Sequence, residues 1–113
     1  MLEERTIKII KAIIKHCNII EDTKKHFGYD YENFEENSIY QNAIHTPVTQ
    51  IGELVKRLPE EFRIEHNEIP WRNIAGMRDI IVHSYETIDK LILWNVADKE
   101  IKKIKEFCMQ LLN

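Results

Sequence analysis

Glycine and proline are so scarce in this sequence that the chain has few places to turn. Only three residues of each kind occur among 113. An all-β fold needs a turn every few residues, so this scarcity argues against one and favours a few long helices. Apolar residues make up 43% of the chain and charged residues 31%, an ordinary globular composition. The sequence therefore predicts an all-α fold in a single domain, residues 1–113.

Apolar residues are spaced by three and four through most of the chain, which is the period of a helix with one buried face. The predicted helices are Leu2 to Lys25, a second from about Glu32–Asn37 to Leu58, a third from Pro70 to Tyr85, a short one from Thr87 to Val96 and a last one with Asp98 as its N-cap. Four main helices and one short helix favour an up-and-down four-helix bundle.

Three features are expected to interrupt this pattern. Gly28 should stop the first helix, and Pro47 should kink or locally break the second. The charged stretch 60–68 should be irregular and can hold one helical turn. In the short helix the apolar residues are Ile88, Leu91, Ile92 and Trp94; in the last helix they are Ile101, Ile104, Cys108 and Leu111.

The charge and the cysteines narrow the possible functions. The net charge is −3, whereas a broad nucleic-acid binder is usually basic, so an RNA substrate would be held at a local site or across a subunit interface. The lysines of the last helix, Lys99, Lys102, Lys103 and Lys105, are interpreted as a solvated face, with an RNA or partner contact as the alternative. Cys17 and Cys108 lie on apolar stripes, which favours buried thiols over a disulfide.

No membrane, metal or cofactor is expected. No apolar run approaches the ~18–20 residues that span a bilayer, and the acidic start is unlike a signal peptide. We therefore expect a cytoplasmic protein. The remaining histidines are scattered without metal-ligand spacing: His16, His26, His45 and His66.

The segment Arg78–Tyr85 concentrates the most chemistry, reading R-x4-H-x-Y inside the third predicted helix. Arginine grips phosphate oxygens with a fork of donors, and histidine transfers protons near neutral pH. Asp79 and His83 are four residues apart and share a helix face with Gly76, so the carboxylate can orient the imidazole and raise its pKa. Taken singly, each residue has an ordinary structural explanation; together, at this spacing, they favour a site for phosphate chemistry.

Arg78 and His83 do not converge within one straight helix. They lie about 140° apart around it. Either the helix unwinds near His83, or a second copy of the chain completes the site. We favour the second arrangement, because the interface of a symmetric dimer places two such motifs around one cleft.

The segment Ile69–Tyr85 closely resembles the core motif of the HepT toxins, a branch of the HEPN superfamily. Gln50–Leu54 is similar to that family's second-helix signature, and Ile88-Asp89 and Leu93-Trp94 are similar to the sequence after its motif. The likeness covers most of the chain. Pro47 and the long charged run before Pro70 depart from the family pattern, but neither touches the motif.

The resemblance implies a helical, homodimeric, metal-independent endoribonuclease with RNA as its substrate. It implies the toxin of a type VII toxin–antitoxin system, paired with an MntA-type nucleotidyltransferase antitoxin. Arg78 and His83 match the family's catalytic arginine and histidine, and Asp79 matches the polar residue after the arginine. Tyr85 matches the tyrosine that accepts AMP from the antitoxin. The alternative is a non-enzymatic partner that regulates a minimal nucleotidyltransferase, which the acidic net charge favours.

Overall fold

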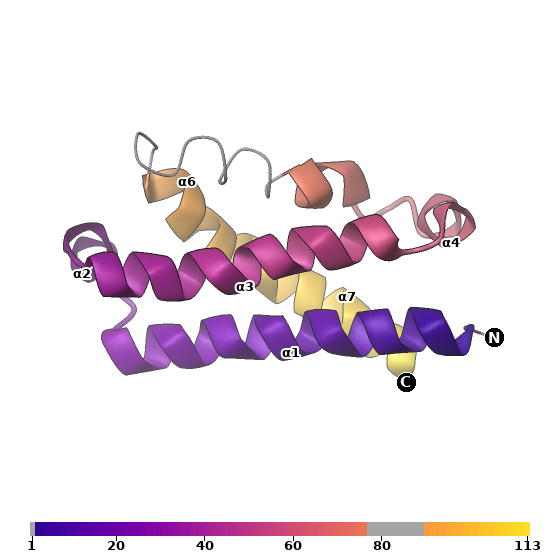
Figure 1. Cartoon of the computed structure of the whole chain (residues 1–113), viewed down its shortest axis with the longest axis horizontal. Helices are drawn as coiled ribbons and strands as arrows, with labels where there is room; N and C mark the ends of the chain where they lie inside the picture. Colours follow the sequence, from indigo (N-terminus) through magenta and orange to yellow (C-terminus); the bar gives the residue numbers. More distant parts are fainter. Residues whose placement is uncertain (1, 77–89) are drawn as a thin grey trace.

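The structure is a computed structural model that describes residues 2–76 and 90–113 (Figure 1). Its elements are α1 (Glu4–Phe27), α2 (Tyr31–Glu36), α3 (Ser38–Arg57), α4 (Glu60–Glu65), α6 (Lys90–Asn95), the π-helical turn η1 (Val96–Glu100) and α7 (Ile101–Leu112). Residues 71–76 are also helical. The described residues contain helices and no strands, which confirms the all-α fold class.

The long helices α1 and α3 lie side by side and antiparallel, and α7 packs against α1 (Figure 1). Their predicted apolar stripes form the core. Its fully buried members include Ile10, Ile13, Cys17, Ile20, Ile44, Val48, Ile51, Val55, Ile101 and Cys108. Burying a side chain of this size stabilises the fold by about 1.5–3 kcal/mol, so these three stripes supply most of the driving force for folding.

The first helix ends where the sequence predicts. Gly28 follows α1 with a φ of 106°, a conformation that favours glycine, and its N–H donates to the Lys24 carbonyl at 2.7 Å. The predicted second helix, in contrast, is two helices. The Asn37 side chain accepts hydrogen bonds from the N–H groups of Ile39 and Tyr40 at 2.9 and 3.1 Å, so it caps α3 and separates it from α2.

Pro47 does not break α3, which is continuous from Ser38 to Arg57. The proline is buried, and its neighbours Ile44, Val48 and Ile51 are fully buried in the core. Packing on both sides of Pro47 therefore offsets the missing backbone hydrogen bond. Of the two expected outcomes, a kink or a local break, the local break is wrong.

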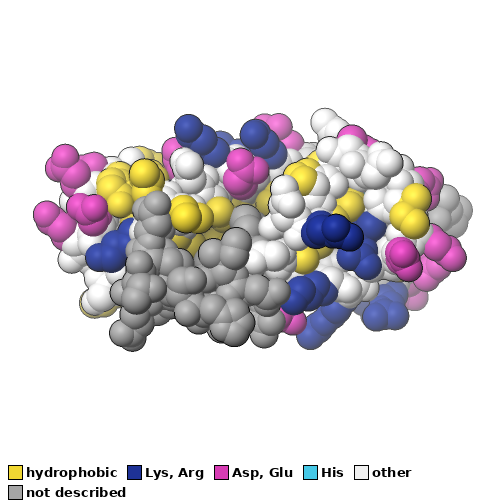
Figure 2. Space-filling model, turned by 90° about the horizontal axis from the view of Figure 1, so that it is seen from above, with side chains coloured by type: hydrophobic (Ala, Val, Ile, Leu, Met, Phe, Trp, Pro, Cys, Tyr) yellow, Lys and Arg dark blue, Asp and Glu magenta, His cyan; other side chains and the backbone are white. Residues whose placement is uncertain are grey.

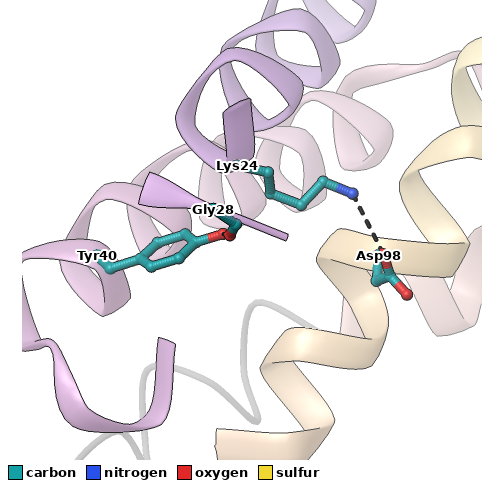
Figure 3. Close-up of polar contacts among 4 residues, drawn as sticks. All are labelled: Lys24, Gly28, Tyr40 and Asp98. Carbon is teal, nitrogen blue, oxygen red and sulfur yellow. Dashed lines mark hydrogen bonds and ion pairs between the residues drawn. The ribbon is translucent and has the colours of Figure 1, made fainter. Parts of the chain in front are cut away.

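The C-terminal third also differs from the prediction. The chain passes from α6 through η1 into α7 without a break, so Asp98 lies inside a helical segment and is not an N-cap. Its carboxylate instead pairs with the Lys24 ammonium at 3.5 Å (Figure 3). The buried residues of α6 are Leu93 and Trp94, whereas Leu91 and Ile92 are about half exposed.

The lysines of the last helix fit the solvated-face interpretation only in part. Lys99 and Lys102 are exposed, and the exposed Lys103 pairs with Glu100 at 3.8 Å. Lys105 pairs with Glu21 of α1 at 3.0 Å, so it fixes α7 to α1. Among the described residues, no helix combines the length and apolar character needed to cross a membrane.

Candidate active site

The four predicted site residues, Arg78, Asp79, His83 and Tyr85, lie outside the described residues. The contact between Asp79 and His83 and the meeting of Arg78 with His83 therefore stay predictions. The helical residues before the motif and helix α6 after it are described, and they show how the fold holds both flanks of the segment.

Residues 71–76 are anchored by Trp71, which is only 5% exposed. Its ring packs against Phe62 of α4 and Phe107 of α7, with centroids 6.2 and 5.4 Å apart. The indole Nε1–H donates to the His66 carbonyl at 3.0 Å. Pro70 lies immediately before the first helical residue, and its carbonyl accepts from the Ile74 N–H at 3.1 Å. The predicted helix start at the Pro-Trp pair is confirmed to within one residue.

Helix α6 is anchored by Trp94 at the other end of the motif. The indole packs against Phe34 of α2 and Tyr40 of α3, with centroids 5.3 and 6.0 Å apart. The Tyr40 hydroxyl donates to the Gly28 carbonyl at 2.7 Å (Figure 3). The Lys90 ammonium also donates to the Glu35 carbonyl at 3.2 Å. Both flanks of the motif are therefore fixed to the bundle by buried aromatic side chains.

Gly76 is the described residue nearest in sequence to the motif. No described atom lies close enough to require a glycine at this position. A Cβ built there meets no atom within 4 Å, and Gly76 is helical. Glycine at this helical position leaves room for the close approach of another backbone or a ligand.

We expect Gly76→Ala to stabilise the fold by about 0.5–1 kcal/mol, because alanine loses less backbone entropy in a helix. Urea unfolding measures this change. If RNA or a second copy approaches Gly76, the more stable variant should nevertheless cleave RNA more slowly. Equal cleavage by both proteins would show that nothing approaches this position.

The two thiols are poor candidates for chemistry. Cys17 and Cys108 are fully buried and not disulfide-bonded, as predicted. Burial raises the pKa of the Cys108 thiol to about 12, and burial, with smaller contributions from Cys108 and Glu21, raises the pKa of the Cys17 thiol to about 12. A buried, protonated thiol is neither a nucleophile nor a metal ligand. Among the described residues, no group of three or more histidines, cysteines and acids could hold a metal ion.

We therefore expect a thiol reagent at pH 8 to modify neither cysteine in the folded protein and both in urea. Since the folded pKa lies above the ordinary value of 9.0, the thiols contribute stability that is complete below pH 9 and is lost as the pH rises towards 12. Urea unfolding across this range should show a falling free energy of unfolding. The fall should be shallower in Cys17→Ala, and an equal fall in both proteins would exclude Cys17 as its cause.

On the face shown in Figure 2, Lys and Arg side chains gather over the C-terminal half of α3 and residues 71–76. Acidic side chains are prominent at both ends of the same face. The net charge of −3 therefore conceals a local basic surface beside the start of the motif. Such a surface can attract an anionic polymer although the whole chain is acidic.

An all-α fold whose sequence carries an arginine–histidine–tyrosine motif between two anchored helical segments is consistent with a HEPN-type domain. Residues 6–111 match the family described as "Ribonuclease HepT-like". The chain therefore belongs to the HepT-like ribonuclease family.

Curated relatives extend over most of the chain. "Putative RNase TTE0752" of Caldanaerobacter subterraneus subsp. tengcongensis is 33% identical over 103 residues, 91% of this chain and 90% of that protein. "Putative RNase MJ0125" of Methanocaldococcus jannaschii is 39% identical over 89 residues, 79% of this chain and 74% of that protein. "Probable ribonuclease HepT" of Thermococcus cleftensis is 36% identical over 96 residues, 85% of this chain and 86% of that protein. No solved structure matches.

Proposed function

We propose that this chain is the toxin of a HEPN–MNT toxin–antitoxin system and a metal-independent endoribonuclease. The observation that carries the proposal is the family match, because it runs from residue 6 to residue 111 and so includes the whole R-x4-H-x-Y segment. In the proposed enzyme Arg78 and His83 act on the RNA, and Asp79 orients His83. A second copy of the chain brings the arginine and the histidine together.

The reaction is an internal transesterification. The 2′-oxygen of the RNA attacks the adjacent phosphorus, and the bond from phosphorus to the 5′-oxygen of the next nucleotide breaks. His83 acts as the general base that takes the 2′-proton or as the general acid that gives a proton to the leaving 5′-oxygen. Arg78 binds the phosphate and stabilises the negative charge that builds in the transition state. The products are a 2′,3′-cyclic phosphate and a 5′-hydroxyl.

The experiment that tests this function is incubation of the pure protein with single-stranded RNA in excess chelator. We expect cleavage, with cyclic-phosphate and 5′-hydroxyl ends. Cleavage that needs a divalent cation, or ends carrying a 5′-phosphate, would contradict the proposed reaction. The second candidate is a non-enzymatic regulatory partner of a minimal nucleotidyltransferase, which the acidic net charge favours. Complete absence of cleavage, together with a stable complex with that transferase, would support it.

Tyr85 is the proposed site of neutralisation. Its phenolic oxygen would attack the α-phosphorus of ATP bound to the antitoxin, pyrophosphate would leave, and the phenolic proton would pass to a base on the antitoxin. The attached AMP would add bulk and a negative phosphate in the same motif as Arg78, where both oppose RNA binding.

Intact mass after co-expression with the cognate transferase should therefore show AMP adducts. The adducts should be absent from Tyr85→Phe and present in the control Tyr29→Phe, which removes a phenol that is 64% exposed. An adduct that persists in Tyr85→Phe would place the acceptor elsewhere.

A further inference from the structure

A hollow of about 390 Å³ lies between α4 and residues 71–76, beside the start of the motif. Its lining residues are Glu60, Arg63, Ile64, Asn67, Trp71 and Arg72. Two arginines thus face one concave surface in an otherwise acidic chain. A guanidinium group binds phosphate oxygens through two parallel N–H donors, so two arginines on one concave surface favour a phosphate ligand.

In the described part of the chain, neither arginine of the hollow is neutralised by a carboxylate. Among the described residues, no acid lies within salt-bridge distance of Arg63 or Arg72, although Glu60 lines the same hollow. The Nε of Arg63 is buried and finds no hydrogen-bond acceptor in the described part of the chain. A buried donor without an acceptor destabilises the protein, so turning the Arg63 side chain into the hollow, where its Nε can donate to a phosphate oxygen, breaks no hydrogen bond of that Nε in the described part of the chain.

The other walls of the hollow suit a nucleic-acid backbone better than a base. Trp71 is only 5% exposed, so it offers no ring face on which a base can stack. The Asn67 side chain lines the same space and can donate to a phosphate or a sugar oxygen. Contacts of this kind position a strand without reading its sequence.

The hollow lies beside residues 71–76, which lead directly into the motif in the sequence. In the helix that the sequence predicts from Pro70 to Tyr85, Arg72 would precede Arg78 by about 9 Å along the axis. The two arginines would also lie about 120° apart around that axis, so an RNA strand that contacts both must pass around the helix. We propose that Arg63 and Arg72 form a phosphate-binding subsite that holds the RNA strand beside the scissile bond. This inference rests on the proposed ribonuclease function and names a part of its substrate site.

The test measures RNA binding separately from cleavage. In a His83→Ala background, which binds RNA without cutting it, fluorescence anisotropy follows a labelled single-stranded RNA of mixed sequence at several salt concentrations. Arg63→Gln with Arg72→Gln should weaken binding on the order of tenfold. The slope of log K against log salt should become shallower by about 1.4, the value for two lost phosphate contacts on a single strand. Arg72→Gln alone, at an exposed position, should give about half of that slope change and guards against misfolding of the double variant.

The matched control removes the same charge from the exposed face of the C-terminal helices. Lys99→Gln with Lys102→Gln should leave the slope nearly unchanged. A control that loses as much as the arginine variant would show a general charge effect and overturn the subsite. Unchanged binding by the arginine variants would also overturn it, while cleavage by the wild-type protein would leave the proposed function standing. If the wild-type protein bound RNA through these arginines but did not cut it, the proposed ribonuclease activity would be wrong and the proposed RNA-binding subsite would stand.

Discussion

Replacing either Arg78 or His83 with alanine is expected to abolish RNA cleavage and growth arrest while the helical fold survives. Loss of a general acid or base costs about 10²–10⁴ in rate, and loss of a group that stabilises transition-state charge costs about 10²–10³. The double variant should be little worse than the more damaging single one, because the two groups act in the same step. Arg78→Lys should recover only part of the activity, since lysine keeps the charge but lacks the fork of donors.

The measurement is RNA cleavage by purified variants, with growth on induction as the cellular readout and circular dichroism as the check on folding. Arg5→Ala and His26→Ala are matched controls, because both residues are exposed on the surface of the bundle. Both controls should cleave RNA at the wild-type rate. A double variant of Arg78 and His83 that remained fully toxic would show that the site lies elsewhere in the chain.

Local periodicity was sufficient to predict the core of this bundle. Each stripe, such as Ile44, Val48 and Ile51, is determined by spacing along one helix, and the structure buries these residues as expected. The positions that differ depend on contacts that no local pattern contains. Pro47 is tolerated inside α3 because the packing around it is extensive. Asp98 is a residue type that often caps helices, but its carboxylate pairs with Lys24 on another helix.

The candidate site also has parts that the local sequence reveals and parts that only the fold brings together. The R-x4-H-x-Y spacing and its Pro-Trp start are local features, so the sequence alone identified them. The proposed subsite at Arg63 and Arg72 has no such local feature, because the two arginines come from separate helical segments that only the fold brings to one hollow. An arginine in an amphipathic segment has no sequence signal that distinguishes a ligand-binding residue from a solvated one.

Asp98→Asn is expected to lower the free energy of unfolding by about 2 kcal/mol. The Lys24 side chain is 2% exposed, and its ammonium lies 3.5 Å from the Asp98 carboxylate (Figure 3). The centroid of the Tyr29 ring lies 6.0 Å from the same ammonium. Removing one partner of a fully buried pair costs about 3–5 kcal/mol, because the other charge stays buried without compensation. The expected loss is smaller here, since the Asp98 side chain is 36% exposed and water partly screens the pair.

Lys24→Met separates the loss of the ion pair from the burial of a lone charge. Methionine retains the length of the lysine stem without its charge, so Lys24→Met with Asp98→Asn should recover most of the stability that Asp98→Asn loses. Urea unfolding of the wild type, the two single variants and the double variant gives a double-mutant cycle. Asp22→Asn, at an exposed position of α1, controls for the loss of one negative charge. If Asp98→Asn were no worse than Asp22→Asn, the pair would contribute nothing. Lys24 and Asp98 join α1 to η1 and lie outside the motif. The folded fraction of Asp98→Asn should therefore retain the wild-type cleavage rate.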